Sequence, residues 1–327
     1  MSEILSLAGS NLLSPIILSF VLGLAAALAR SDLTIPEAVA KGMSIYLLFA
    51  IGFKGGVAVS AHGVDTTLIL TVLAGVFLSF LLPFVAFALL RLLTGLSRTD
   101  AAAVAAHYGS ISIVTFVAAT SVLESRLISS EGYMVAVAAV MEAPAILSAL
   151  WLVVRGGEGK SGKLDPELMR EIMLNGSIVL LVGAFFIGAV TGEKGFAEIS
   201  AFIETPFKGV LCLFLLDMGL IAGRGLRQSK GVLGAPVIAF AIMMPVIGAT
   251  LGLVLGAMIG LSLGGVVLLM VLSASASYIA VPAAMRVALP EADPSIYLTL
   301  SLGVTFPFNL TLGIPLYLAV AQTVIGG

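Results

Sequence analysis

The sequence predicts an all-α polytopic membrane protein with about ten membrane-spanning helices arranged as two inverted five-helix repeats. Three observations support this fold class: the composition, a succession of long apolar runs, and an internal repeat. Hydrophobic residues make up 60 % of the 327 residues, charged residues make up 10 %, and the mean hydropathy is +1.17. A soluble domain of this size could not bury so much apolar surface.

Long apolar runs, separated by loops rich in glycine, proline and charged residues, define the predicted helices. The segment before the first run lacks the basic region and cleavage site of a secretory signal, so we expect the first run to remain as a membrane helix. The predicted spans are residues 12–30, 37–60, 66–93, 101–123, 132–154, 172–191, 205–223, 231–259, 265–287 and 295–324.

The two halves of the chain share a spaced set of residues. The matching pairs, at offsets of 163 to 167 residues, are Lys41-Gly42 with Lys208-Gly209, Gly52-x-x-x-Gly56 with Gly219-x-x-x-Gly223, and Pro144 with Pro307. Each half holds five spans, an odd number, so the second half must enter the membrane from the opposite face. The sequence therefore predicts a first repeat at 1–154, a linker at 155–171 and an inverted second repeat at 172–327.

Basic residues predict the orientation in the membrane. Of the 16 Lys and Arg residues, 12 lie on the side reached after odd-numbered spans, and only Lys54, Arg126, Lys194 and Lys208 lie nearer the other side. The positive-inside rule then places the linker 155–171 in the cytoplasm and both termini outside, as a multi-pass protein of the inner membrane.

Alternating hydroxyl residues interrupt the fourth and ninth predicted spans. Residues at i and i+2 lie on opposite sides of an α-helix, so such rows favour an opened helix over an intact one. A break exposes N–H groups at a half-helix N-terminus, and two such termini facing each other would bind a small anion without arginine. A single serine would more ordinarily bond to its own helix, and the matched pair of rows favours a site. The predicted substrate-binding residues are Gly109, Ser110, Ser112, Thr115, Ser273, Ser275 and Ser277.

Glu142 in the fifth span is the second candidate for function. A carboxylate near the middle of a membrane costs about 2.5 to 3.5 kcal/mol, so it pairs, takes up a proton or coordinates a cation. Its counterparts in the tenth span are neutral and rich in oxygen: Thr305, Asn309 and Thr311. These four residues predict a Na⁺ site, with ordinary interhelical hydrogen bonding as the alternative.

Enzymatic chemistry has little support in the sequence. The chain contains only two histidines, His62 and His107, and neither a zinc-protease motif nor a second aspartate placed for an intramembrane dyad. We expect His107 to be interfacial or hydrogen-bonded, with a proton relay as the alternative. We expect Lys54 to pair with Asp217 in the corresponding span. Transport, without an organic cofactor, is the predicted class of function.

Four stretches of the second half resemble a known family. They are residues 215–220 (LLDMGL), 273–282 (SASASYIAVP), 290–297 (PEADPSIY) and 304–317 (VTFPFNLTLGIPLY), which are similar to the sodium-dependent bicarbonate transporter family known from cyanobacteria. The resemblance implies ten helices with a gate-like and a core-like bundle, discontinuous crossing helices 4 and 9, and a homotrimer. It also implies uptake of bicarbonate with Na⁺ as the coupling ion.

The first half departs from the family in two places. The family carries a Ser-Gly-Ser-Thr string in the fourth helix, whereas this chain reads Ser112-Ile113-Val114-Thr115, and the acidic residue of the fifth helix is Glu142 instead of aspartate. The expected function is therefore Na⁺-coupled uptake of bicarbonate or a similar small anion by an elevator-like mechanism. A Na⁺ or H⁺ symporter of a small organic acid and an anion channel are the alternatives. The linker is short, and the regulatory partner is left open.

Overall fold

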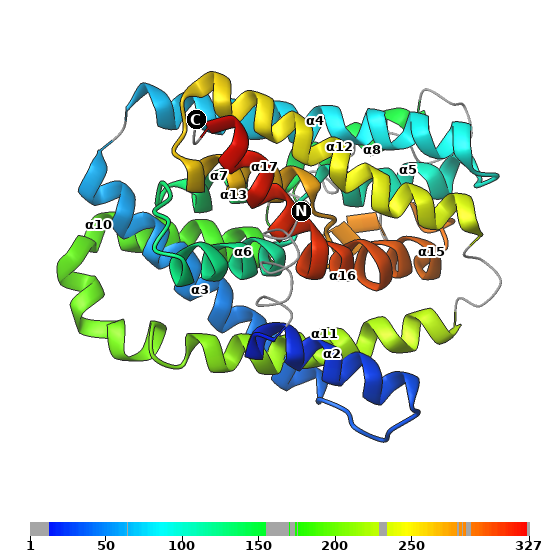
Figure 1. Ribbon diagram of the computed structural model, residues 1–327, viewed down its shortest axis with the longest axis horizontal. Coiled ribbons are helices and arrows are strands. Elements are labelled where there is room, and N and C mark those ends of the chain that lie inside the picture. The colour runs from blue at the N-terminus through cyan, green and yellow to red at the C-terminus, as the bar shows by residue number, and fades with distance from the viewer. Residues whose placement is uncertain are drawn as a thin grey trace.

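The computed structural model describes residues 13–63, 65–154, 170, 174, 176–228, 234–279, 281–282, 284–285 and 289–325. Over these residues the chain forms helices and no strand (Figure 1). Eight helical segments are long and apolar enough to cross a membrane, and Pro15–Leu28 and Leu263–Ala274 are two shorter apolar helices. The prediction of an all-α polytopic membrane protein is confirmed, whereas most of the predicted linker lies outside the described residues.

The first half contains two divided spans. Its helices are α2 (Pro15–Leu28), α3 (Glu37–His62), α4 (Thr66–Leu93), α5 (Arg98–Gly109), α6 (Ile113–Ser125), α7 (Met134–Val140) and α8 (Ala143–Val154). Side chains of Ser14, Asp65 and Ser97 accept hydrogen bonds from the first turns of α2, α4 and α5, which fixes where these helices begin. The predicted fourth span is split between α5 and α6, and the fifth is interrupted at Met141 and Glu142.

The second half contains α10 (Gly176–Ile203), α11 (Phe207–Gln228), α12 (Ala235–Ile259), α13 (Leu263–Ala274) and α15 (Pro294–Leu298). Two π-helical segments, η1 (Thr299–Thr305) and η2 (Asn309–Gly313), flank the short α16 (Phe306–Phe308) and lead into α17 (Ile314–Ile325). The predicted sixth span ends at 191, but α10 continues to Ile203 beyond a kink at Gly192. The kink has φ 57°, a left-handed value that glycine adopts without a Cβ penalty.

Helices α2, α3, α10 and α11 form one unit, in the lower part of Figure 1, which we call the four-helix unit. Within it α10 packs along α3, and α11 packs along α2. A Cβ atom added to Gly219 would collide with the carbonyl oxygen of Phe20, and one added to Gly56 would collide with that of Phe185. The repeated glycines therefore let pairs of backbones touch where lipid provides no hydrophobic driving force.

The remaining helices form a second, larger unit. In it α4 packs on α5, α8 and α12, while α13 packs on α12, α17 and α6. These helices occupy the upper and middle parts of Figure 1. We call them the larger unit.

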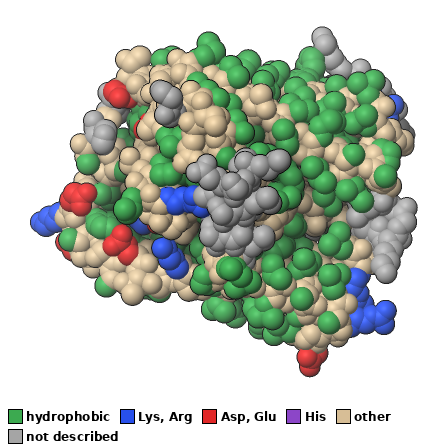
Figure 2. Space-filling model, in the orientation of Figure 1, with side chains coloured by type: hydrophobic (Ala, Val, Ile, Leu, Met, Phe, Trp, Pro, Cys, Tyr) green, Lys and Arg blue, Asp and Glu red, His purple; other side chains and the backbone are tan. Residues whose placement is uncertain are grey.

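The surface agrees with a membrane-spanning protein. Figure 2 shows most Lys, Arg, Asp and Glu side chains in the left part and at the lower right of this face, and hydrophobic side chains over much of the remaining described surface. Exposed large apolar side chains such as Phe77 on α4, Phe186 on α10 and Val254 on α12 lie on long apolar helices. Such residues are stable in contact with lipid.

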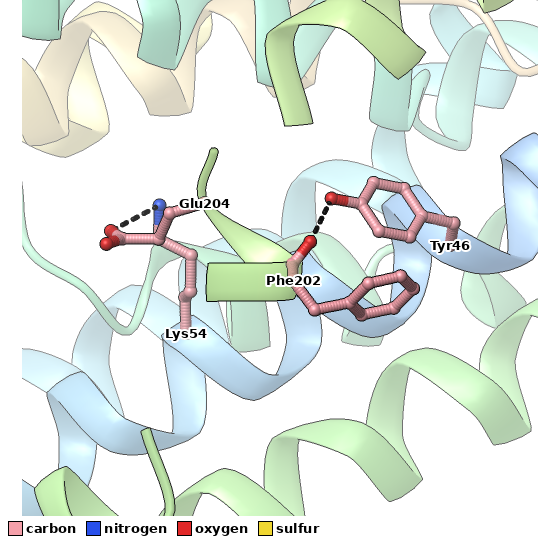
Figure 3. Close-up of polar contacts among 4 residues, drawn as sticks. All are labelled: Tyr46, Lys54, Phe202 and Glu204. Atoms are coloured by element: carbon pink, nitrogen blue, oxygen red, sulfur yellow. Dashed lines mark hydrogen bonds and ion pairs between the residues drawn. The ribbon is translucent and has the colours of Figure 1, made fainter. Parts of the chain in front are cut away.

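The predicted ion pair between Lys54 and Asp217 is wrong. The Lys54 ammonium lies 3.8 Å from a carboxylate oxygen of Glu204, and the Tyr46 hydroxyl donates to the carbonyl of Phe202 at 2.6 Å (Figure 3). Lys54 lies beside the start of α11, because its ammonium is 5.8 Å from the Phe207 ring centre. Asp217 is ten residues further along α11, or about 15 Å at 1.5 Å per residue, and is out of reach.

Candidate functional site

The first hydroxyl row forms an extended break between two half-helices. Helix α5 ends at Gly109, where a Cβ atom would strike the ring of Pro83 and the side chain of Ala145. Ser110 (φ −90°, ψ 174°) and Ser112 (φ −106°, ψ 105°) have extended backbones, and α6 begins at Ile113. Side chains two residues apart on an extended strand point the same way, so the alternating row becomes one polar edge.

The second hydroxyl row also marks the end of a half-helix. Helix α13 ends at Ala274, and Ser275 (φ −84°, ψ 163°) is extended. The Asn309 side-chain amide donates to the free carbonyl of Ala274 at 2.9 Å, which satisfies a group that the helix end leaves without an internal partner. The two rows thus open their helices at corresponding points of the sequence repeat.

The two breaks meet in the interior of the protein. The Ser112 N–H donates to Oγ of Ser275 at 3.0 Å, and the Ser277 N–H donates to the carbonyl of His107 at 2.8 Å. These bonds join residues more than 160 positions apart. The structure therefore brings together the two rows that the sequence singled out, and all three serines are buried.

The beginning of α6 is a potential anion site. Oγ of Ser112 accepts from the Thr115 N–H at 3.2 Å and from the Thr115 hydroxyl at 2.8 Å. The N–H groups of Ile113 and Val114 lie in the first helical turn, where no helical carbonyl can reach them. The helix dipole adds about half a positive charge at this end.

Not every predicted hydroxyl contributes to this edge. Ser273 lies in the last turn of α13, and its hydroxyl donates to the Leu269 carbonyl four residues earlier at 2.9 Å. This is the ordinary back-bonding of a helical serine. Ser110, Ser112, Thr115, Ser275 and Ser277 remain as the buried polar residues at the crossing.

Glu142 lies beside the same break. It occupies the turn between α7 and α8 and is 7 % exposed. The Ser110 hydroxyl donates to its Oε2 at 3.2 Å, which joins the first hydroxyl row to the carboxylate. Glu142 also lines a small cavity, with room for about one water molecule, together with Leu48, Ile111, Ser112, Ile113, Ser277, Tyr278 and Ile279.

The predicted partners of Glu142 form their own network. The Thr305 hydroxyl donates to the Ala241 carbonyl at 2.7 Å and accepts from Tyr108 at 2.7 Å. Oδ1 of Asn309 accepts from the Tyr317 hydroxyl at 2.8 Å, and the Thr311 hydroxyl donates to the Pro307 carbonyl four residues earlier at 2.7 Å. Among the described residues none of the three shares a hydrogen bond with Glu142, and no three His, Cys, Asp or Glu side chains cluster as metal ligands.

Aromatic residues around the site were missed by the sequence patterns. Tyr278 follows the second row directly and lines the cavity with Glu142, so its position after Ser277 was an available signal. Tyr108 precedes the first row and supports Thr305. His107 is fully buried, with Nδ1 2.6 Å from the Ala103 carbonyl, and its ring stacks on Tyr297 at 4.5 Å. It is hydrogen-bonded, as one alternative predicted, and it is not interfacial.

Three cavities with shared lining residues lie between the break and the start of α11. The cavity at Glu142 shares Ile113 and Ile279 with a second small cavity, and the second shares Ile51 and Val117 with a third, larger one. The second cavity lies at the boundary of the two units and is lined by Ser44, Leu47, Ile51, Ile113, Val114, Val117, Leu211, Phe214 and Ile279. This almost wholly apolar second cavity, which we call the constriction, lies between the polar cavity at Glu142 and the larger third cavity.

The sequence model of the Na⁺-dependent bicarbonate transporter superfamily matches residues 15–322, nearly the whole chain. A comparison with curated proteins gives no match. The matched region includes both helix breaks and Glu142.

Proposed function

We propose, since the chain belongs to the Na⁺-dependent bicarbonate transporter superfamily, that it is a secondary active transporter that takes up bicarbonate or a similar small anion with Na⁺. One observation carries this proposal: the N-terminus of α6 and the Glu142 carboxylate border the same buried cavity. The first favours an anion, and the second favours a cation.

The anion would bind through backbone donors at the break. The N–H groups of Ile113 and Val114 point along the start of α6, and the hydroxyls of Ser112 and Ser277 border the same cavity. The family carries glycine and serine at the positions of Ile113 and Val114. The backbone N–H donors at these positions are present whichever side chain follows. Ile113 and Val114 instead make the site narrower and more apolar, which favours a small anion with few polar atoms.

Electrostatics explains why the anion would need Na⁺. An anion beside ionised Glu142 places two negative charges in one desolvated cavity, and repulsion at low dielectric is strong. A cation between them removes this repulsion, so each ion favours the binding of the other. We propose Glu142, Thr305, Asn309 and Thr311 as the Na⁺ ligands, because each of the three neutral side chains keeps an unused oxygen lone pair in its present hydrogen bonds.

Movement would occur at the boundary between the two units. We assign the four-helix unit as the gate and the larger unit as the core, which would slide as in an elevator. Glycine contacts between backbones hold the four-helix unit together, whereas apolar side chains with small voids line the boundary near the break. Apolar contacts without hydrogen bonds can be exchanged at low cost during sliding.

The cellular placement rests on the basic residues. We propose an inner-membrane protein with the linker in the cytoplasm and both termini outside, so that α6 leads from the break toward the outside. A homotrimer is proposed from the family resemblance, and the mass of the purified particle would test it.

Counterflow of labelled bicarbonate in proteoliposomes tests the function directly. We expect saturable uptake that requires Na⁺ on the same side as the label. Saturable, Na⁺-dependent uptake of a small carboxylic acid in place of bicarbonate would identify the symporter of an organic acid. Flux that neither saturates nor responds to Na⁺ would identify a channel and refute the proposal.

A further inference from the structure

Two cavities with shared lining residues lie along the part of α6 that is remote from the break. The larger, of about 680 Å³, lies between the start of α2, the second half of α6, the start of α11 and the junction of η2 with α17. The smaller, of about 270 Å³, lies between α3, α6, α7 and the start of α11. Ser121 and Lys208 line both, and we call the two together the vestibule.

The charged residues that line the larger cavity are all basic. Among the described residues that line it, the charged ones are Arg126 and Lys208, and none is acidic. Neither cation forms an ion pair with a described residue. Their charges are therefore available to an ion in the cavity.

The smaller cavity has charged residues of both signs. Lys54 pairs with Glu204 at 3.8 Å. The two oxygens of Glu131 accept from the Ser262 N–H at 2.7 Å and the Ser262 hydroxyl at 2.9 Å, where they cap α13. Glu124 and Glu131 keep their negative charges, so the smaller cavity has no positive excess. The positive excess of the vestibule lies in the larger cavity, at Arg126 and Lys208.

The basic residues predicted at the outer side of the membrane are few, and most of them lie around the vestibule. Only four of the 16 basic residues are predicted at the outer side, and Lys54, Arg126 and Lys208 are three of them. All three line the vestibule. The few basic residues predicted at the outer side therefore cluster around the vestibule, whose smaller cavity shares Ile51 and Val117 with the constriction.

We propose that Lys208 and Arg126 form an anion-collecting site in this vestibule, which concentrates the small substrate anion before it passes the apolar constriction. A cavity lined by one sign of charge between low-dielectric walls focuses the field and raises the local concentration of the opposite ion. The inference rests on the proposed function, because it assigns a role to these residues in anion uptake.

Cys212 provides a probe that does not depend on transport. It is the only cysteine of the chain, it is partly exposed, and it lines the larger cavity one helical turn after Lys208. A reagent that reaches its thiol must enter the vestibule. Comparison of an anionic with a cationic reagent of similar size then reports the local field.

The experiment measures the reaction rates of Cys212 in purified protein with sulfonatoethyl and trimethylammonioethyl methanethiosulfonate, each relative to a free thiol in solution. We expect the anionic reagent to be favoured at low ionic strength. Lys208→Gln should lower the anionic to cationic rate ratio about fivefold, since one charge some 8 Å away changes each rate about twofold in water. Arg126→Gln should lower the ratio in the same direction, Lys208→Arg should restore it, and high salt should reduce it.

Lys41→Gln is the matched control. Lys41 occupies the repeat position of Lys208 near the start of α3 and does not line the vestibule, so its loss should leave the ratio unchanged. An equal ratio in the wild type and Lys208→Gln, or no reaction of Cys212 with either reagent, would overturn the vestibule proposal. A charge-dependent ratio in a protein without Na⁺-dependent anion counterflow would instead keep the vestibule and reject the proposed function.

Discussion

Replacing Glu142 by glutamine removes the only charge at the proposed ion site while preserving its shape. Glutamine keeps a side-chain oxygen that can accept from Ser110, so we expect the protein to fold. Glu142 is 7 % exposed, and bulk water therefore cannot replace the lost charge as a ligand. Removing a charged ligand from a desolvated cation costs more than about 1.4 kcal/mol, which is a factor of at least ten in affinity.

Uptake of labelled bicarbonate at varied Na⁺ should then show a half-maximal Na⁺ concentration at least tenfold higher in Glu142→Gln. A second readout avoids transport. Na⁺ that binds the folded wild type should raise its thermal stability with concentration, and this effect should be lost in the variant. Without Na⁺ the variant should be no less stable than the wild type, because a buried carboxylate carries a desolvation cost that the amide lacks.

Glu198→Gln is a suitable control, because Glu198 is an exposed residue of α10 beyond the Gly192 kink. It should leave both readouts unchanged. An unaltered Na⁺ dependence in purified, folded Glu142→Gln would show that the coupling ion binds elsewhere, and the electrostatic argument for coupling would fail with it.

Three further predictions address the anion site, the topology and the packing. Ser112→Ala should weaken substrate affinity by about 1 kcal/mol, the value of one neutral hydrogen bond. Ser112→Leu should abolish uptake, whereas the control Thr250→Leu, on the exposed face of α12, should not. Full transport by Ser112→Leu would exclude the break as the binding site. In a Cys212→Ala background, a cysteine at Gly157 should react with impermeant thiol reagents only after cells are opened, and the opposite result would invert the orientation. Gly219→Ala should destabilise the protein by about 1 to 3 kcal/mol in thermal unfolding, because its Cβ would strike the Phe20 carbonyl. Gly42→Ala, with nothing within 4 Å, should be neutral or slightly stabilising, and equal effects of the two would contradict the packing.

The helix breaks were predictable because their signal is local. Alternating hydroxyls at Ser110 and Ser112 fit an extended backbone and not a helix, and the repeat at Ser275 and Ser277 indicated a partner. The sequence repeat then favoured a meeting of the two rows, which the Ser112 to Ser275 hydrogen bond confirms. Patterns of this kind depend only on neighbours along the chain and on the offset between the halves.

Side-chain partners were harder to predict because they depend on how helices are rotated and shifted against one another. Lys54 and Asp217 occupy corresponding spans, but Lys54 lies beside the start of α11 and pairs with Glu204, which precedes that helix. Asp217 is about ten residues further along α11, or about 15 Å away along the helix axis. His107 was expected near a span end, yet the break at Gly109 places it in the interior beneath Tyr297. The sequence contains no measure of either displacement.

The two halves of the chain differ in the residues proposed to hold the ions, and this asymmetry bears on the proposed coupling. A cavity formed by two equal halves would place like groups around the substrate. Here the first half provides a carboxylate at Glu142, whereas the ligands that we propose from the second half, Thr305 and Asn309, are neutral oxygens. An anion bound as proposed near the α6 N-terminus would therefore meet a negative charge on one side only. A cation bound there would compensate this charge without leaving an excess of positive charge in the site. On this view the coupling ion replaces the arginine that an anion site otherwise uses, and because the ion is free to leave, the same site can release its substrate.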